Sequence, residues 1–175
     1  MGAFDHLPPE TAEGHVHVVV ECPRGSRAKV EYDPALGVFA LDRVLYAAVH
    51  FPADYGFVPG TRAADGDPLD ALVLAEAPTC PGCLVRVRLL GVLTVVKDDR
   101  REPKLLGVPA GEPRFAELRD VADLPAHVRQ EIAHFFEVYK ELEGDDLASL
   151  GWDGAAQARA VLAAAVAAAG PAPRA

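Results

Sequence analysis

The sequence predicts an α+β, mainly β fold: a small closed β-barrel with flanking helices at its C-terminal end. Three observations predict it. Short β-rich runs recur up to about residue 108, Gly and Pro residues separate them, and the pattern changes to helical spacing after residue 120. Many short strands joined by tight turns are typical of barrels, whereas alternating strands and helices would favour a parallel sheet.

Six segments in the first part of the chain have strand character. Each is rich in β-branched or other apolar residues and is bounded by turn residues, as strands are. The predicted strands are residues 15–21, 28–32, 38–42, 72–75, 84–96 and 105–108. Cys80-Pro81-Gly82-Cys83 precedes the fifth of them and has the spacing of a redox pair or half a zinc site. No second pair or nearby His completes a zinc site, and Pro-Gly favours a tight turn.

Two helices are predicted after residue 120. Asp123 is the expected N-cap, Pro125 lies in the first turn and Gly144 is the expected stop. Apolar residues at spacings of three and four form one helix face: Val128, Ile132, Phe135, Tyr139 and Leu142. An alanine-rich second helix is expected over about residues 154–169, packed either on its own barrel or on a neighbouring chain.

The chain of 175 residues fits a single domain. We expect a loose N-terminal arm over residues 1–14, one domain over residues 15–170 and a frayed tail over residues 171–175.

Composition excludes several classes of partner. The net charge of −9 makes the chain a poor general ligand for nucleic acid or an anionic membrane surface. The longest apolar run, residues 160–169, has about half of the ~20 residues that a membrane span needs. Three cysteines are an odd and sparse set, so we expect a cytoplasmic protein without a disulfide framework.

The segment Asp65-Gly66-Asp67-Pro68-Leu69-Asp70 is the central chemical feature. Its three carboxylates repel one another unless cations neutralise them, and hard divalent cations favour such oxygen ligands. An EF-hand is excluded, because Asp70 stands where the loop needs Gly and Pro68 interrupts the ligands. An acidic surface turn is the simpler alternative.

Residues upstream supply the complementary charges. Lys29 and Glu31 are two positions apart and share one face of a predicted strand, and Arg43 follows. Tyr55 can present its hydroxyl to an oxyanion. Carboxylates for Mg²⁺ together with cations for phosphate oxygens are what a metal–phosphate site requires, although each of these charges by itself is more often a solvated surface residue.

These motifs resemble the family I soluble inorganic pyrophosphatases of bacterial type. The resemblance covers residues 15–165 in order and with near-constant spacing. It is carried by Val20-Glu21-Cys22-Pro23, Lys29-Val30-Glu31-Tyr32, Leu41-Asp42-Arg43, Pro52-Ala53-Asp54-Tyr55-Gly56-Phe57, the segment 65–70 and Ala133-His134-Phe135-Phe136-Glu137-Val138-Tyr139-Lys140. The resemblance implies a five-stranded OB-like barrel, a homo-oligomer (commonly a hexamer) and Mg²⁺-dependent hydrolysis of pyrophosphate by direct attack of a metal-activated water.

The resemblance also implies roles for individual residues. Asp65 and Asp70 would bind Mg²⁺ directly, and Asp67 would accept the proton of the attacking water, with Tyr55 beside it in the catalytic set. Glu21 and Glu31 would hold metal-bound waters or a further cation. The implied ligands of phosphate oxygens are Lys29, Arg43, Tyr55, Lys104, Tyr139 and Lys140.

The chain departs from the family pattern at three positions. Glu102 replaces a common Asp, and it keeps a carboxylate for metal. Phe51 replaces a common Tyr and removes one hydroxyl. Lys97 replaces another Asp, so a positive charge stands beside a proposed cation site. Either Asp98 or Asp99 takes the ligand position, or the Lys97 ammonium takes over part of one metal's electrostatic role, or Lys97 points to solvent.

These departures leave two alternatives to a pyrophosphate hydrolase. The chain can be a relative that binds phosphate or metal without turnover. It can also be a hydrolase of nucleotides or another phosphoanhydride, although no nucleoside-stacking signal favours that.

Overall fold

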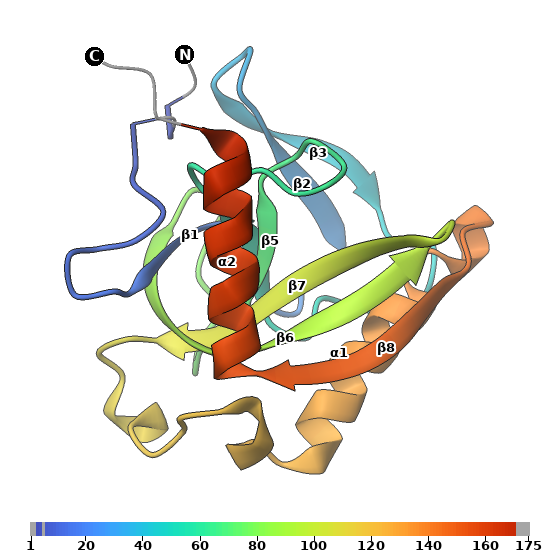
Figure 1. Cartoon of the computed structure of the whole chain (residues 1–175). Helices are drawn as coiled ribbons and strands as arrows, with labels where there is room; N and C mark the ends of the chain where they lie inside the picture. Colours follow the sequence, from blue (N-terminus) through green and yellow to red (C-terminus); the bar gives the residue numbers. More distant parts are fainter. Residues whose placement is uncertain (1–2, 5, 171–175) are drawn as a thin grey trace.

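The structure is a computed structural model that describes residues 3–4 and 6–170. Five strands form its centre (Figure 1): β1 (Val16–Cys22), β4 (Asp54–Val58), β5 (Leu69–Val73), β6 (Leu84–Lys97) and β7 (Arg100–Pro109). They pair in the order β1-β4-β5-β7-β6, and β6 returns to β1, so the sheet closes on itself. The pairing of β5 with β7 is parallel and the others are antiparallel. The predicted five-stranded barrel is confirmed.

Three further strands lie outside the barrel ring. β8 (Leu147–Gly154) pairs with the second half of β6, beyond the part that pairs with β1. β2 (Ala28–Asp33) and β3 (Val38–Val44) form a separate hairpin. The sequence predicted neither β8 nor β4 as a strand. Gly56 allows β4 to approach β1 closely, since a Cβ at this position would lie 1.9 Å from the carbonyl oxygen of Val19.

The turn interpretation of the Cys-Pro-Gly-Cys segment is confirmed. The Cys83 amide donates a 3.0 Å hydrogen bond to the Cys80 carbonyl, and Gly82 has the left-handed φ of +87° that such a turn requires. All three cysteines are free thiols.

The first long helix begins later than predicted. α1 (Ala126–Val138) has Pro125 as its N-cap, so the assignment of Asp123 as N-cap is wrong. Asp123 instead ends a short 3₁₀ helix, η2 (Val121–Asp123), where its carboxylate accepts a 2.9 Å hydrogen bond from the Asp120 amide. Another 3₁₀ helix, η1 (Pro113–Phe115), precedes η2.

The same helix also ends earlier than predicted. Tyr139 is the C-cap of α1, and η3 (Glu141–Glu143) follows it. Gly144 does act as a stop, with a left-handed φ of +86°, but it ends η3. Leu142 is consequently exposed and does not belong to the buried face of α1.

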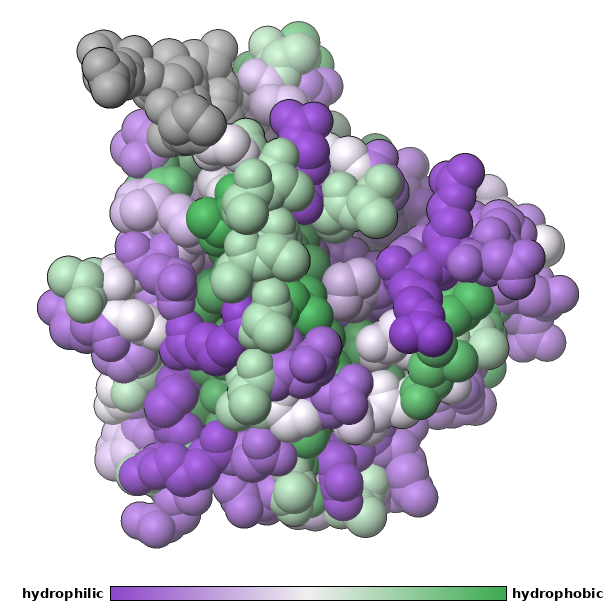
Figure 2. Space-filling view, in the orientation of Figure 1, coloured by the Kyte–Doolittle hydropathy of each residue, from purple (hydrophilic) through white to green (hydrophobic). Residues whose placement is uncertain are grey.

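The second helix, α2 (Ala155–Ala169), packs on its own barrel. Ala158, Leu162 and Ala165 are buried against strand residues such as Val58 and Leu105. The outward side of α2 remains apolar because it is lined by alanines, which form a pale column down the centre of Figure 2. Of the two packing alternatives for this helix, the structure shows its buried face against its own barrel. The expected frayed tail, residues 171–175, lies outside the described residues.

Residues of the predicted arm contact the β2–β3 hairpin. Phe4 packs edge-on against Tyr32, with ring centroids 4.8 Å apart, and Glu10 forms an isolated bridge with Val16. In the part of the chain that the structure describes, no helix is long and apolar enough to cross a membrane.

Candidate active site

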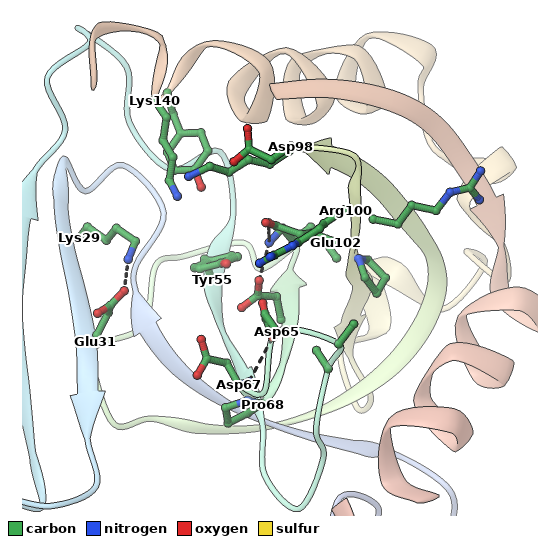
Figure 3. A pocket seen from close by; sticks show the side chains of 18 residues that line it. Lys29, Glu31, Tyr55, Asp65, Asp67, Pro68, Asp98, Arg100, Glu102 and Lys140 are labelled. Carbon is green, nitrogen blue, oxygen red and sulfur yellow. Dashed lines mark hydrogen bonds and ion pairs between the residues drawn. The ribbon is translucent and has the colours of Figure 1, made fainter. Parts of the chain in front are cut away.

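A cavity of about 890 Å³ lies between β2, the loop before β5, the β6–β7 hairpin and the end of α1 (Figure 3). It collects residues from distant parts of the chain. The predicted site residues that line it are Lys29, Glu31, Tyr55, Asp65, Asp67, Asp70, Glu102, Lys104, Tyr139 and Lys140. These residues are up to 111 positions apart in the sequence (residue 29 to residue 140), and the fold brings them together around one cavity.

The acidic loop has a fixed backbone. Gly66 has a φ of +98°, which side-chain-bearing residues rarely adopt, and the Asp67 amide donates a 3.1 Å hydrogen bond to the Asp65 carboxylate. Burial raises the pKa of Asp67, and the nearby charges of Asp65 and Asp70 raise it further. The loop thus holds its acids close enough together to repel one another, which a bound cation would relieve.

Lys104 is the internal counter-ion of these acids. Asp70 on β5 and Lys104 on β7 are partners in the register of the two parallel strands, and the Lys104 Nζ lies 2.5 Å from the Asp70 Oδ2. A second carboxylate, that of Glu102, lies 3.1 Å away. Burial by itself would lower the pKa of Lys104, which is 4% exposed, but its anionic neighbours, chiefly Asp70 with Glu102, together outweigh burial and the pKa rises. Lys104 therefore stays charged inside the barrel.

Two phenols face the same cavity, half-buried Tyr55 and buried Tyr139. Tyr55 on β4 stacks on Phe51, with ring centroids 5.5 Å apart, and Tyr139 stacks on Phe135 at 5.1 Å. Burial raises the pKa of both phenols, and the Asp70 carboxylate raises that of Tyr55 further. Both hydroxyls therefore keep their protons at neutral pH and can donate hydrogen bonds to an oxyanion.

Lys29 and Lys140 lie on the side of the cavity away from Arg100 and Glu102 (Figure 3). Lys29 pairs with Glu31, so the two share one face of β2 as predicted, and it also lies 3.3 Å from the Asp42 carboxylate. Burial lowers the pKa of Lys140, and the neighbouring cations Lys97, Lys29 and Arg43 lower it further. The concentration of positive charge is high enough here for lysines to repel one another.

The cavity as a whole is much less acidic than the chain. Six basic and six acidic side chains line it, whereas the chain carries a net charge of −9. A pocket with interleaved charges can bind a metal ion and a multiply charged anion side by side.

Comparison with known proteins assigns the family. The profile described as "Inorganic pyrophosphatase" matches residues 18–169. The chain belongs to the inorganic pyrophosphatase family. One curated relative, the inorganic pyrophosphatase of Geobacillus stearothermophilus, is 48% identical over 139 residues, which is 79% of this chain and 84% of the relative. The corresponding protein of Thermus thermophilus is 52% identical over 128 residues, 73% of each chain.

Solved structures of the family have the same fold. The Thermus thermophilus inorganic pyrophosphatase superposes with a TM-score of 0.91 at 42% identity, covering 96% of this chain and 99% of that one. The Helicobacter pylori enzyme gives 0.90 at 37% identity, covering 95% and 99%. The resemblance drawn from the motifs is confirmed, and with it the class of enzyme, an inorganic diphosphatase.

Two of the predicted site residues do not line the cavity. Glu21 lines a neighbouring cavity of about 750 Å³ on the far side of Asp67 and Asp70. Burial raises its pKa to about 7, and it accepts a 2.8 Å hydrogen bond from the Tyr32 amide. Arg43 instead pairs with Glu143, at 2.8 Å, and with Asp42.

The β6–β7 hairpin brings residues that the sequence reasoning missed. Arg100 and Arg101 line the cavity, and their only signal in the sequence is a basic pair next to acidic residues. Of the two acids considered at the hairpin turn, Asp98 lines the cavity and Asp99 is absent from its lining. Lys97 lines it as well, so its side chain belongs to the pocket rather than to open solvent.

The donor set fits a hard divalent cation. Asp65, Asp67, Asp70 and Glu102 provide only carboxylate oxygens, which Mg²⁺ prefers. Within the described residues no three acidic, His or Cys side chains already enclose a common point. The Lys104 ammonium contacts both Asp70 and Glu102. A cation that binds Asp70 and Glu102 must therefore share these carboxylates with Lys104 or displace its ammonium from them.

Proposed function

We propose that the chain hydrolyses inorganic pyrophosphate to two phosphates in this cavity, with Mg²⁺ as its metal and water attacking phosphorus directly. The observation that carries the proposal is the interleaving of oxygen-only acids with lysines and protonated phenols around one cavity. The family name of the relatives supports the substrate.

The acidic side of the cavity would hold the metal. We assign Asp65, Asp70 and Glu102 as its ligands, with Glu31 and Glu21 near further cation positions. When bound, Mg²⁺ would act as a Lewis acid that neutralises phosphate charge and makes water more acidic.

Asp67 is the proposed general base. Its raised pKa makes its carboxylate a better proton acceptor than an ordinary Asp. It lines the cavity on the same loop as Asp65, so it can accept the proton of a water placed there.

The basic and phenolic groups bind the substrate and its products. Lys29, Lys104 and Lys140 donate charge-assisted hydrogen bonds to phosphate oxygens, and the Tyr55 and Tyr139 hydroxyls donate neutral ones. We also assign Arg43 to this set, although its guanidinium must exchange Glu143 or Asp42 to reach a phosphate. Fixed donors aimed at developing negative charge stabilise the leaving phosphate.

The Asp67→Asn variant tests the catalytic assignment. Removing a general base lowers kcat by about 10²–10⁴-fold, and the substrate contacts made by the lysines should keep KM close to that of the unchanged protein. Asp99→Asn is a matched control, since this acid is on the neighbouring hairpin but outside the cavity lining. Equal kcat values for the two variants would remove Asp67 from the mechanism.

We further propose a cytoplasmic homo-oligomer, a hexamer by family resemblance. Three free thiols are compatible with a reducing compartment. The β2–β3 hairpin exposes Val38, Leu41 and Val44, and Tyr46 follows it, also exposed. Such an apolar surface supports self-association. Light scattering after size-exclusion chromatography measures the mass directly; a mass of one chain, 18.5 kDa, would refute the oligomer.

A further inference from the structure

The β6–β7 hairpin fixes Lys97 at the rim of the cavity. Lys97 ends β6 and pairs with Arg100 at the start of β7. The two residues between them, Asp98 and Asp99, have left-handed φ values of +49° and +61°, as a tight two-residue hairpin turn requires. The backbone of Lys97 is therefore held by the sheet on one side and a tight turn on the other.

The Lys97 ammonium has an exchangeable partner. Its Nζ lies 2.5 Å from the Asp145 Oδ2, and the side chains are 26% and 33% exposed. Asp145 lies outside the cavity lining, in the turn between η3 and β8. An ion pair this exposed contributes little stability, so a competing anion in the cavity can displace Asp145 at low cost.

Lys97 is one of several cations directed at the same space. Lys97 and Lys140 both line the cavity, and Lys97 is near enough to lower the pKa of Lys140. Among the described residues no carboxylate forms an ion pair with Lys140. Asp98 and Glu102 also lie near Lys97, but neither forms an ion pair with Lys97 or Lys140. Two ammonium groups at one rim favour a multiply charged anion.

We propose that Lys97 is a substrate ligand that leaves Asp145 and binds phosphate oxygens together with Lys140. The positive charge that it adds lowers the dependence of pyrophosphate binding on divalent cations. This inference rests on the proposed function and deepens it, since it assigns a specificity-determining residue of the same site. The alternative is a structural ion pair in which Lys97 only anchors Asp145.

The two members of the ion pair distinguish these accounts. If Lys97 binds the anion, Lys97→Gln weakens binding while Asp145→Asn leaves it unchanged or tightens it. If the pair is only structural, both variants have the same effect. Lys97→Arg keeps the charge and should retain most of the binding. Arg159→Gln is a remote control, because Arg159 is also in an exposed ion pair, with Glu10.

The direct experiment is calorimetric titration of the full-length protein with imidodiphosphate, a pyrophosphate analogue with a P–N–P bridge, in EDTA. A charge-assisted hydrogen bond is worth about tenfold in affinity, so Lys97→Gln should weaken binding about tenfold while the Asp145 and Arg159 variants do not. Equal weakening by Lys97→Gln and Asp145→Asn, or no change in either, would overturn the proposal. No measurable metal-free binding by the unchanged protein would overturn it too.

A second readout is the Mg²⁺ concentration that gives half-maximal phosphate release. It should rise for Lys97→Gln, which removes the charge without adding a carboxylate, and stay constant for Asp145→Asn; an unchanged Mg²⁺ profile for Lys97→Gln would contradict the proposal. A protein that binds the analogue through Lys97 but releases no phosphate at saturating Mg²⁺ would refute the proposed function and leave the Lys97 assignment standing.

Discussion

Lys104→Met isolates the contribution of the buried ammonium to the stability of the metal-free protein. Lys104 is 4% exposed and forms ion pairs with Asp70 and Glu102. Methionine has a similar length and fits beside the Phe136 ring, which lies 5.8 Å from the ammonium. The variant therefore removes the charge with little change in packing.

The expected cost follows from the exposure of the remaining acids. Removing one partner of a fully buried ion pair costs about 3–5 kcal/mol, because the other charge stays buried and uncompensated. Here the side chains of Asp70 and Glu102 are 29% and 26% exposed, so water solvates them in part. We expect the free energy of unfolding to fall by about 2–3 kcal/mol in EDTA.

Mg²⁺ should recover much of this loss, because it neutralises the same carboxylates. A ligand at 100 times its Kd stabilises the folded state by about 2.7 kcal/mol, and the variant's more negative site should bind the cation more tightly. The assay is urea unfolding of both proteins with EDTA and with Mg²⁺. Lys140→Met is the matched control, since Lys140 lines the same cavity without an ion pair among the described residues.

The control should change the free energy of unfolding by about 0.5 kcal/mol or less. Equal destabilisation by the two variants would refute the role of Lys104 as internal counter-ion. A loss for Lys104→Met that is the same with and without Mg²⁺ would refute the view that metal and ammonium share these carboxylates.

Two further predictions concern groups outside the reaction. Asp54 is 1% exposed and accepts hydrogen bonds from the Arg24 amide (2.8 Å) and from the amide and hydroxyl of Thr79 (3.0 and 2.7 Å). Asp54→Ala should lower the free energy of unfolding, measured with urea, by about 3–4 kcal/mol. A decrease of less than about 1 kcal/mol would contradict this prediction. Burial raises the pKa of the Cys22 thiol to about 12, so at pH 8 a thiol reagent should label exposed Cys80 first and Cys22 only after unfolding; rapid labelling of Cys22 in the folded protein would contradict the packing.

The barrel was predictable where the chain has strong local patterns. The strand Val16–Cys22 is rich in valine, so its sequence alone predicts it. The strand Leu147–Gly154 has no such pattern: its sequence, LASLGWDG, contains two glycines and no β-branched residue. It is extended because β6 is long enough to pair with both β1 and β8, which is a tertiary effect.

The site was predictable as a set of residues but not as an arrangement. The acidic segment and its basic partners were recognisable from residue types and motif order. The contact between Asp70 and Lys104 depends on the parallel pairing of β5 with β7, 34 positions apart, which no local pattern encodes. The placement of Glu21 beside a second cavity depends in the same way on how the strands close.

The most direct test of the central claim is the initial rate of phosphate release from pyrophosphate as Mg²⁺ is raised from zero to saturation, with ATP as comparator substrate. We predict negligible release without Mg²⁺, a rate that rises and saturates with the cation, and far slower release from ATP. Intact pyrophosphate at saturating Mg²⁺ and neutral pH would contradict the account, as would equal rates on the two substrates.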